Sequence, residues 1–222
     1  MKKIKKVSLA FLLFVVYVII SIFLEIMFRV CLNSTNLWIS SFCQILENLF
    51  VLLVISIPFV PTLIDNFKNF KKDNLKNAYK NWFWGLLIMY ISNIIIITIT
   101  KGIASNESYN RDILFQSPIF AITVMVFIAP MIEELIFRLS LKDIFKNKWI
   151  YATVSGLIFG LMHMTTITRP IELLYTISYG SLGFFFAKSV YETDNIFSSI
   201  IAHMTHNGLI ITILLLSKYL GV

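Results

Sequence analysis

The chain has 222 residues, of which 58% are hydrophobic and only 14% are charged, and its mean hydropathy is +0.81. A water-soluble domain of this length would carry roughly 25% charged residues and could not bury so much apolar surface. The formal net charge is +7, but the lysines lie in short loops and no motif typical of nucleic-acid binding is present. The composition therefore predicts a polytopic membrane protein with no nucleic-acid partner.

Seven segments contain enough apolar residues to cross a membrane as helices, which takes about 20 residues each. They are 7–30, 38–64, 82–104, 117–141, 149–167, 171–187 and 196–219. The sixth is short and the last is long, so either could be split or re-entrant. Pro58 and Pro61 are expected to kink or end the second, because proline removes a backbone donor. We predict an all-α bundle of about seven spans, with residues 1–222 as a single membrane-embedded domain.

The first segment follows a basic N-terminus that resembles the start of a signal peptide. Its apolar run, residues 7–24, exceeds the ~7–15 residues of a signal-peptide core, and no small-x-small cleavage pattern follows it. We expect a retained transmembrane helix.

Lysines are concentrated in every second loop. The basic segments are the N-terminus, 65–81 and 142–148, and those with few basic residues are 31–37, 105–116 and 168–170. Because Lys and Arg concentrate in cytoplasmic loops, the N-terminus is predicted to be cytoplasmic and the C-terminus outside. The expected location is the cell membrane, and the abundance of Ile, Lys and Asn favours a bacterial source.

Cys31 and Cys43 are the two cysteines, and both lie near one short loop. Their spacing is compatible with a disulfide and equally with two unpaired thiols. Neither has a histidine-bearing motif beside it that would indicate a nucleophile.

Several polar or ionisable residues interrupt the later apolar segments. They are Glu133, Glu134, Arg138, His163, His203, His206 and Asn207. An ionisable side chain costs several kcal/mol at the bilayer centre and usually faces a site or a water-filled cavity. These residues predict chemistry within the membrane.

Helical spacing assigns different surroundings to the two glutamates. Glu134 and Arg138 are four positions apart and can pair along one face, which a purely structural ion pair would also explain. Glu133 points about 100° away around the helix, toward a different neighbour. A second acid in the same membrane helix favours a functional role.

The histidines lie on two other helices. Gly156 and Gly160 form a G-x-x-x-G pattern that permits close helix packing and would place His163 at the resulting seam. His203 and Asn207 are one turn apart on one face, so both could donate to a developing oxyanion. His206 could support the site, but we expect a spare histidine of the core or lipid edge.

The helical rise gives a depth for each group. Measured from the predicted cytoplasmic helix ends, the depths are ~12 Å for Glu133, ~21 Å for His163, ~11 Å for His203 and ~17 Å for Asn207. The groups could meet in one cavity in the cytoplasmic half, and we expect substrate to enter from that half.

These residue types favour amide hydrolysis. A carboxylate and an imidazole can take a proton from water, and a neighbouring pair of donors can stabilise a tetrahedral oxyanion. Glu and His also bind zinc, whose bound water would serve equally well. No H-E-x-x-H motif is present, so zinc ligands would have to come from separate helices. Residue types alone do not separate these two mechanisms.

The pattern resembles the CAAX prenyl endopeptidase and bacteriocin-processing (CPBP) family of intramembrane proteases, also called Abi. Its motifs E-E-x-x-x-R, F-x-x-x-H and H-x-x-x-N/D match Glu133-Glu134-x-x-x-Arg138, Phe159-x-x-x-His163 and His203-x-x-x-Asn207, within about residues 117–210. The resemblance implies that Glu133 and His163 activate water and that His203 and Asn207 form the oxyanion hole. It assigns Glu134 and Arg138 to organising the site, and of the mechanisms it allows we prefer the one without a metal or other cofactor.

The resemblance implies a hydrophobic, prenylated or leader-peptide substrate cut near the cytoplasmic membrane face. Two other functions stay open. A bacteriocin-immunity or partner-binding membrane protein could keep the same fold without catalysis, although pure binding does not require two oxyanion donors. A proton-coupled or metal transporter is disfavoured, because there is no internal repeat and no pair of broken helices in corresponding halves. The sequence does not indicate the oligomeric state.

Overall fold

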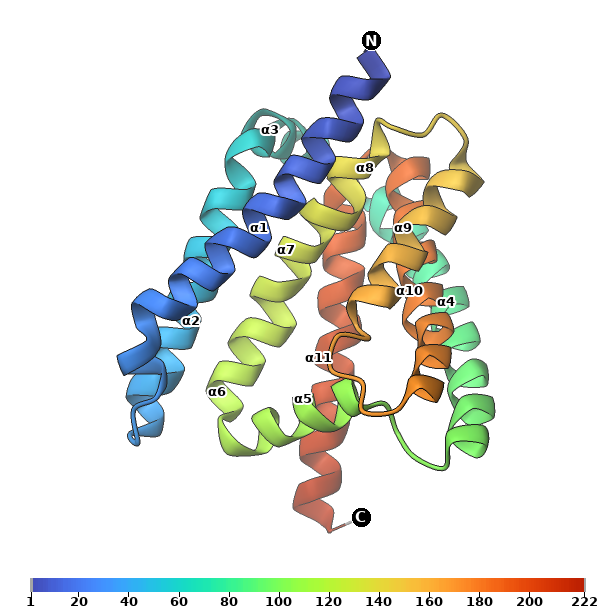
Figure 1. Cartoon of the computed structure of the whole chain (residues 1–222). Helices are drawn as coiled ribbons and strands as arrows, with labels where there is room; N and C mark the ends of the chain where they lie inside the picture. The colour runs from blue at the N-terminus through green and yellow to red at the C-terminus, as the bar shows by residue number, and fades with distance from the viewer. Residues whose placement is uncertain (1, 222) are drawn as a thin grey trace.

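The computed structural model describes residues 2–221 and, within them, consists of helices without strands. The elements are α1 (Lys2–Leu32), α2 (Leu37–Ser56), η1 (Ile57–Phe59), α3 (Val60–Lys68), α4 (Lys72–Thr100), α5 (Ser105–Gln116), α6 (Pro118–Ala121), η2 (Ile122–Ile128), α7 (Ala129–Glu134), η3 (Leu135–Leu139), α8 (Ser140–Lys142), α9 (Lys148–Met162), η4 (Pro170–Leu174), α10 (Tyr175–Thr193) and α11 (Ile196–Leu220). The chain passes along the bundle seven times, and its two ends lie at opposite ends of the bundle (Figure 1). The predicted polytopic helical bundle is confirmed.

Five of the passes are long and apolar enough to span a membrane: Leu9–Leu32, Leu37–Lys68, Lys72–Thr100, Pro118–Lys142 and Ile196–Leu220. The apolar helix α9 has 15 residues and is about 22 Å long, shorter than the ~30 Å hydrocarbon core. Helix α10 packs against both α9 and α4. The fifth and sixth predicted spans are therefore two closely packed helices, which differ from the five long ones.

Several boundaries differ from the sequence expectation. Residues 105–116, expected as a loop, form the helix α5, where Glu107 and Arg111 pair at 2.8 Å. Hydropathy does not reveal this helix because it is short and polar. The kink predicted at Pro58 and Pro61 is present, since the 3-10 turn η1 separates α2 from α3.

Small residues allow α9 and α10 to approach closely. A Cβ atom added to Gly156 would lie 2.6 Å from the carbonyl oxygen of Gly180, and one added to Gly160 would lie 2.5 Å from that of Thr176. Both distances are far below van der Waals contact, so no larger residue fits without moving a backbone. The predicted docking of the glycine face is confirmed, and it places the end of α9 beside α10.

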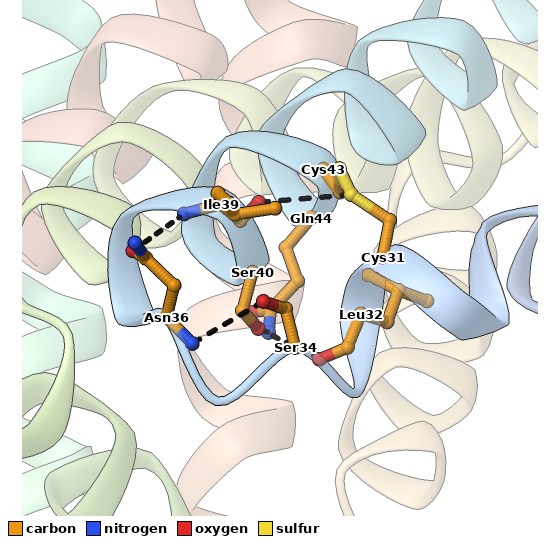
Figure 2. The surroundings of a disulfide bond; sticks show 8 residues. All are labelled: Cys31, Leu32, Ser34, Asn36, Ile39, Ser40, Cys43 and Gln44. Atoms are coloured by element: carbon orange, nitrogen blue, oxygen red, sulfur yellow. Dashed lines mark hydrogen bonds between the residues drawn. A yellow bond between two sulfur atoms is a disulfide. The ribbon is translucent and has the colours of Figure 1, made fainter.

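A disulfide joins Cys31 of α1 to Cys43 of α2 (Figure 2), which settles the alternative left open by the sequence. The intervening turn is ordered by Asn36, whose side chain accepts from the Trp38 backbone N–H at 3.0 Å and caps α2. Ser40 Oγ donates to the Leu32 carbonyl at 2.8 Å. This turn lies at the end of the bundle away from the N-terminus (Figure 1).

Ion pairs and hydrogen bonds hold α4, α9 and α10 together at the other end of the bundle, away from the α1–α2 turn. Glu192 pairs with Lys148 at 2.9 Å and with Lys188 at 3.2 Å, and it accepts from Asn77 at 3.1 Å. Burial acts to raise the pKa of Glu192, but these donors outweigh it and lower the pKa to about 2. Glu192 therefore stays ionised and cross-links three helices.

The glycine seam predicts a stability difference between two chemically identical substitutions. Gly156→Ala should lower thermal stability in detergent by about 1–3 kcal/mol, because the added methyl overpacks the seam. Gly208→Ala is the matched control, since its Cβ would meet only Val126 Cγ1 at 3.5 Å, an ordinary contact. Equal melting temperatures for the two variants would contradict the close packing.

Candidate active site

The helix that carries the two glutamates is irregular on both sides of them. The π-helical segments η2 and η3 flank the short α7, and π-bulges occur frequently at functional sites. The Ala129 N–H donates to the Val124 carbonyl, five residues back. The next carbonyl, that of Met125, would need the N–H of Pro130 in the same register, and proline has none. Met125 is thus left with a free backbone acceptor.

Asn207 of α11 occupies that acceptor. Its Nδ2 donates to the Met125 carbonyl at 2.7 Å. A carboxamide carries two N–H donors, so the second one is available to another group. The π-helical register of η2 therefore positions the side-chain amide of Asn207 on α11.

Glu134 and Arg138 form the ion pair expected from their spacing. Arg138 Nε lies 3.3 Å from Glu134 Oε2, and both side chains are fully buried. The guanidinium also lies 4.3 Å from the centre of the Phe159 ring, a cation–π contact. The pair thus forms a buried layer behind Glu133, whose side chain is partly exposed.

His203 joins the two glutamates. Its Nδ1–H donates to Glu134 Oε1 at 2.9 Å, and its Nε2 lies 3.6 Å from Glu133 Oε2. The ring stacks on Phe186, with the ring centres 5.0 Å apart. A hydrogen bond to one ring nitrogen determines the role of the other. Glu134 therefore orients His203 so that Nε2 faces Glu133.

His163 ends α9 and is oriented by its own helix. Its backbone N–H donates to the Gly160 carbonyl at 3.3 Å, which leaves the Phe159 carbonyl without its usual helical partner. His163 Nδ1–H donates to that carbonyl at 2.9 Å, so in the neutral ring Nε2 keeps its lone pair. Tyr179 stacks on the ring, with the ring centres 4.6 Å apart.

One cavity of about 570 Å³ brings together the four residues predicted to be catalytic. Its lining includes Glu133, His163, His203 and Asn207, and the Glu133 side chain is 26% exposed. Glu134 and Arg138 do not line it, in keeping with their place behind the site. His206 is buried and also lines this cavity.

The cavity extends away from the lysine-rich loops. Its lining continues from the site to Asn93 of α4 and to Asn106, Asn110 and Arg111 of α5. No residue of 65–81 or 142–148 lines it, among those that the structure describes. The described lining therefore does not reach the loops expected to be cytoplasmic, and α5, which hydropathy missed, forms part of the cavity wall.

Sequence reasoning also missed several groups around the site. The signal for the free Met125 carbonyl was Pro130, inside an apolar segment and five residues from Met125. Nothing in the local pattern singled out Tyr179 or Phe186, since an aromatic residue in an apolar helix is ordinary. Within residues 2–221, no set of three or more His, Cys, Asp or Glu side chains is arranged to hold a metal ion.

Comparison with known proteins places the matched region over this site. Residues 115–209 match the family model described as type II CAAX prenyl endopeptidase Rce1-like. A Bacillus subtilis protein with the name "Putative membrane peptidase YdiL" is 27% identical over 160 residues, which cover 63% of this chain and 61% of that protein. An uncharacterized protein of Mycoplasma capricolum is 24% identical over 208 residues, which cover 85% of this chain and 60% of that protein. The chain thus spans about three-fifths of the length of these relatives, and no solved structure matches it significantly.

The buried ion pair predicts a large stability effect. Arg138→Ala leaves the Glu134 charge uncompensated and should cost about 3–5 kcal/mol, measured as thermal unfolding in detergent. Arg111→Ala is the matched control, because its pair with Glu107 is 40% and 30% exposed and should contribute about 0–1 kcal/mol. A fully stable Arg138→Ala protein would contradict the structural role of the pair.

Proposed function

We infer that this chain hydrolyses a peptide bond within the membrane, because it belongs to the CAAX prenyl endopeptidase and bacteriocin-processing family. The three motifs of the family occur in order, and each contributes to the lining of one cavity, through Glu133, through Phe159 and His163, and through His203 and Asn207. The single observation that carries the proposal is His203 between the two glutamates, on the same cavity as His163 and Asn207.

The proposed reaction begins with water in the cavity. Glu133, assisted by His163 Nε2, takes one proton from the water as its oxygen attacks the carbonyl carbon of the substrate. The carbonyl oxygen becomes an oxyanion, which accepts hydrogen bonds from the second N–H of Asn207 and from His203 in its imidazolium form, the form in which Nε2 carries a proton as well as Nδ1. The C–N bond then breaks, and the proton held by the base is transferred to the leaving nitrogen. The products are a carboxylic acid, which keeps the second proton of the water, and an amine; transfer of that proton between them gives a carboxylate and an ammonium group.

Glu134 and Arg138 have a supporting role in this scheme. Glu134 accepts from His203 Nδ1 and thereby directs Nε2 into the cavity. Arg138 neutralises Glu134 within a layer that water does not reach. The substrate proposed for this site is a hydrophobic, prenylated or leader-peptide segment, and its scissile bond would lie at the depth of Glu133.

Glu133 provides the most direct test. Glu133→Gln removes the proton acceptor while keeping the size of the side chain, and it should lower hydrolysis by about 10²–10⁴-fold, the contribution expected of a general base. Purified protein would be incubated with a library of hydrophobic peptides, and the cleavage products quantified by mass spectrometry. Glu47→Gln, on α2 and outside the lining of the cavity, is the control.

Normal turnover by Glu133→Gln would refute this assignment. The same assay distinguishes the zinc-dependent alternative. A site without metal keeps its activity after dialysis against a chelator, whereas a zinc-dependent site loses activity and regains it when zinc is returned. Metal analysis of the active protein gives the stoichiometry.

The oxyanion donors are tested separately. His203→Ala and Asn207→Ala should each lower kcat by about 10²–10³-fold with a smaller change in KM. Thr212→Ala, on the same helix and exposed, should leave the rate unchanged. Full activity of both His203→Ala and Asn207→Ala would exclude an oxyanion hole formed by these two side chains. Thermal unfolding should accompany the assay, because Asn207→Ala also leaves the Met125 carbonyl unpaired.

A further inference from the structure

The route into the cavity lies between α4 and α11. These helices contact each other near one end, where Tyr79 and Thr205 share a hydrogen bond of 3.0 Å. Farther from that end, Asn93 and Ile97 of α4 and Ile213 of α11 line the cavity. Ile97 and Ile213 are 40% and 48% exposed, so this part of the lining continues to the surface of the bundle.

Helix α5 forms the polar end of this route and is firmly held. Its first residue, Ser105, donates its backbone N–H to Glu172 Oε2 at 3.0 Å. Glu172 is 1% exposed and also accepts from Thr168 at 3.1 Å and from Arg169 at 3.3 Å. Arg169 in turn donates to the Thr100 carbonyl at 3.0 Å. The buried carboxylate therefore fastens the start of α5 to the segment that follows His163.

A second link runs from α5 to the catalytic residues. Asn106 of α5 and Tyr179 both line the cavity, and Tyr179 stacks on His163. Asn106 and Arg111 line the same cavity as His163. The polar wall of α5 is thus continuous with the site.

Two independent features place α5 on the outer side of the membrane. The lysine-rich loops lie at the other end of the bundle and indicate the cytoplasm. The Cys31–Cys43 disulfide joins the end of α1 to α2, and the turn between these helices lies at the same end of the bundle as α5 (Figure 1). Disulfides persist in oxidising compartments outside the cytoplasm.

We propose that the catalytic cavity is loaded from the outer side of the membrane, so that its substrate is a peptide segment presented there. This rests on the proposed peptidase function and replaces cytoplasmic entry. From Pro118 to Glu133 the helical rise is about 22 Å, which an extended chain covers in about six or seven residues. The substrate is therefore an unfolded, largely apolar segment of at least about that length.

The test is the accessibility of Asn93→Cys to a membrane-impermeant charged methanethiosulfonate in intact cells. Asn93 lines the cavity in the last third of α4, and its replacement should be modified without permeabilisation, as should Ser108→Cys on the exposed side of α5. Ile94→Cys is the matched control, because the neighbouring Ile94 is 66% exposed on the apolar surface of the bundle and faces lipid, where thiols do not ionise. Asn147→Cys should react only after permeabilisation.

Modification of Asn93→Cys only after permeabilisation, or its failure to react while Ser108→Cys does, would overturn the proposal. So would reaction of Ser108→Cys only in permeabilised cells, since the topology would then be inverted. None of these outcomes depends on catalysis. In a second arm, peptide added outside right-side-out vesicles should be cleaved, and peptide added outside inside-out vesicles should not. Cleavage only in inside-out vesicles would refute outer loading, whereas absence of cleavage in both, with Asn93→Cys labelled, would count against the peptidase alone.

Discussion

The carboxylate of Glu134 is the centre on which the site depends. One oxygen accepts from His203 of α11 at 2.9 Å, and the other lies 3.3 Å from Arg138 on its own helix. Because all three groups are buried, loss of any one would leave a charge or a donor without compensation in an apolar interior. This requirement joins two helices in one register and turns His203 Nε2 toward Glu133.

The irregular helical segments leave backbone carbonyl groups free to accept hydrogen bonds from side chains of the site. A continuous α-helix uses its carbonyls internally, whereas η2 and Pro130 leave the Met125 carbonyl for Asn207. The end of α9 repeats this arrangement, since the Phe159 carbonyl is released by the helix and accepts from the His163 side chain. In both cases a backbone acceptor without a helical partner orients a polar side chain of the site.

Packing of small residues sets the depth at which these groups meet. Gly156 and Gly160 bring the short α9 against α10, so His163, Tyr179 and Phe186 surround the site. The bundle is closed around the Glu134–Arg138 layer and remains open toward α5, where Glu172 holds the wall in place. Two buried carboxylates therefore stabilise the cavity, Glu134 at its catalytic end and Glu172 at the end formed by α5.

The sequence by itself determined the class of protein, the all-α fold and the candidate residues, because hydropathy, lysine placement and helical spacing are local properties. It also predicted the Glu134–Arg138 pair and the glycine seam from i, i+4 positions on single helices. Only the tertiary structure decided that His203 contacts both glutamates, that Asn207 binds the Met125 carbonyl, that His206 lines the cavity, and that the cavity extends toward α5. These features depend on the relative rotation and translation of separate helices, which packing across the whole bundle sets and which no periodicity within one segment encodes.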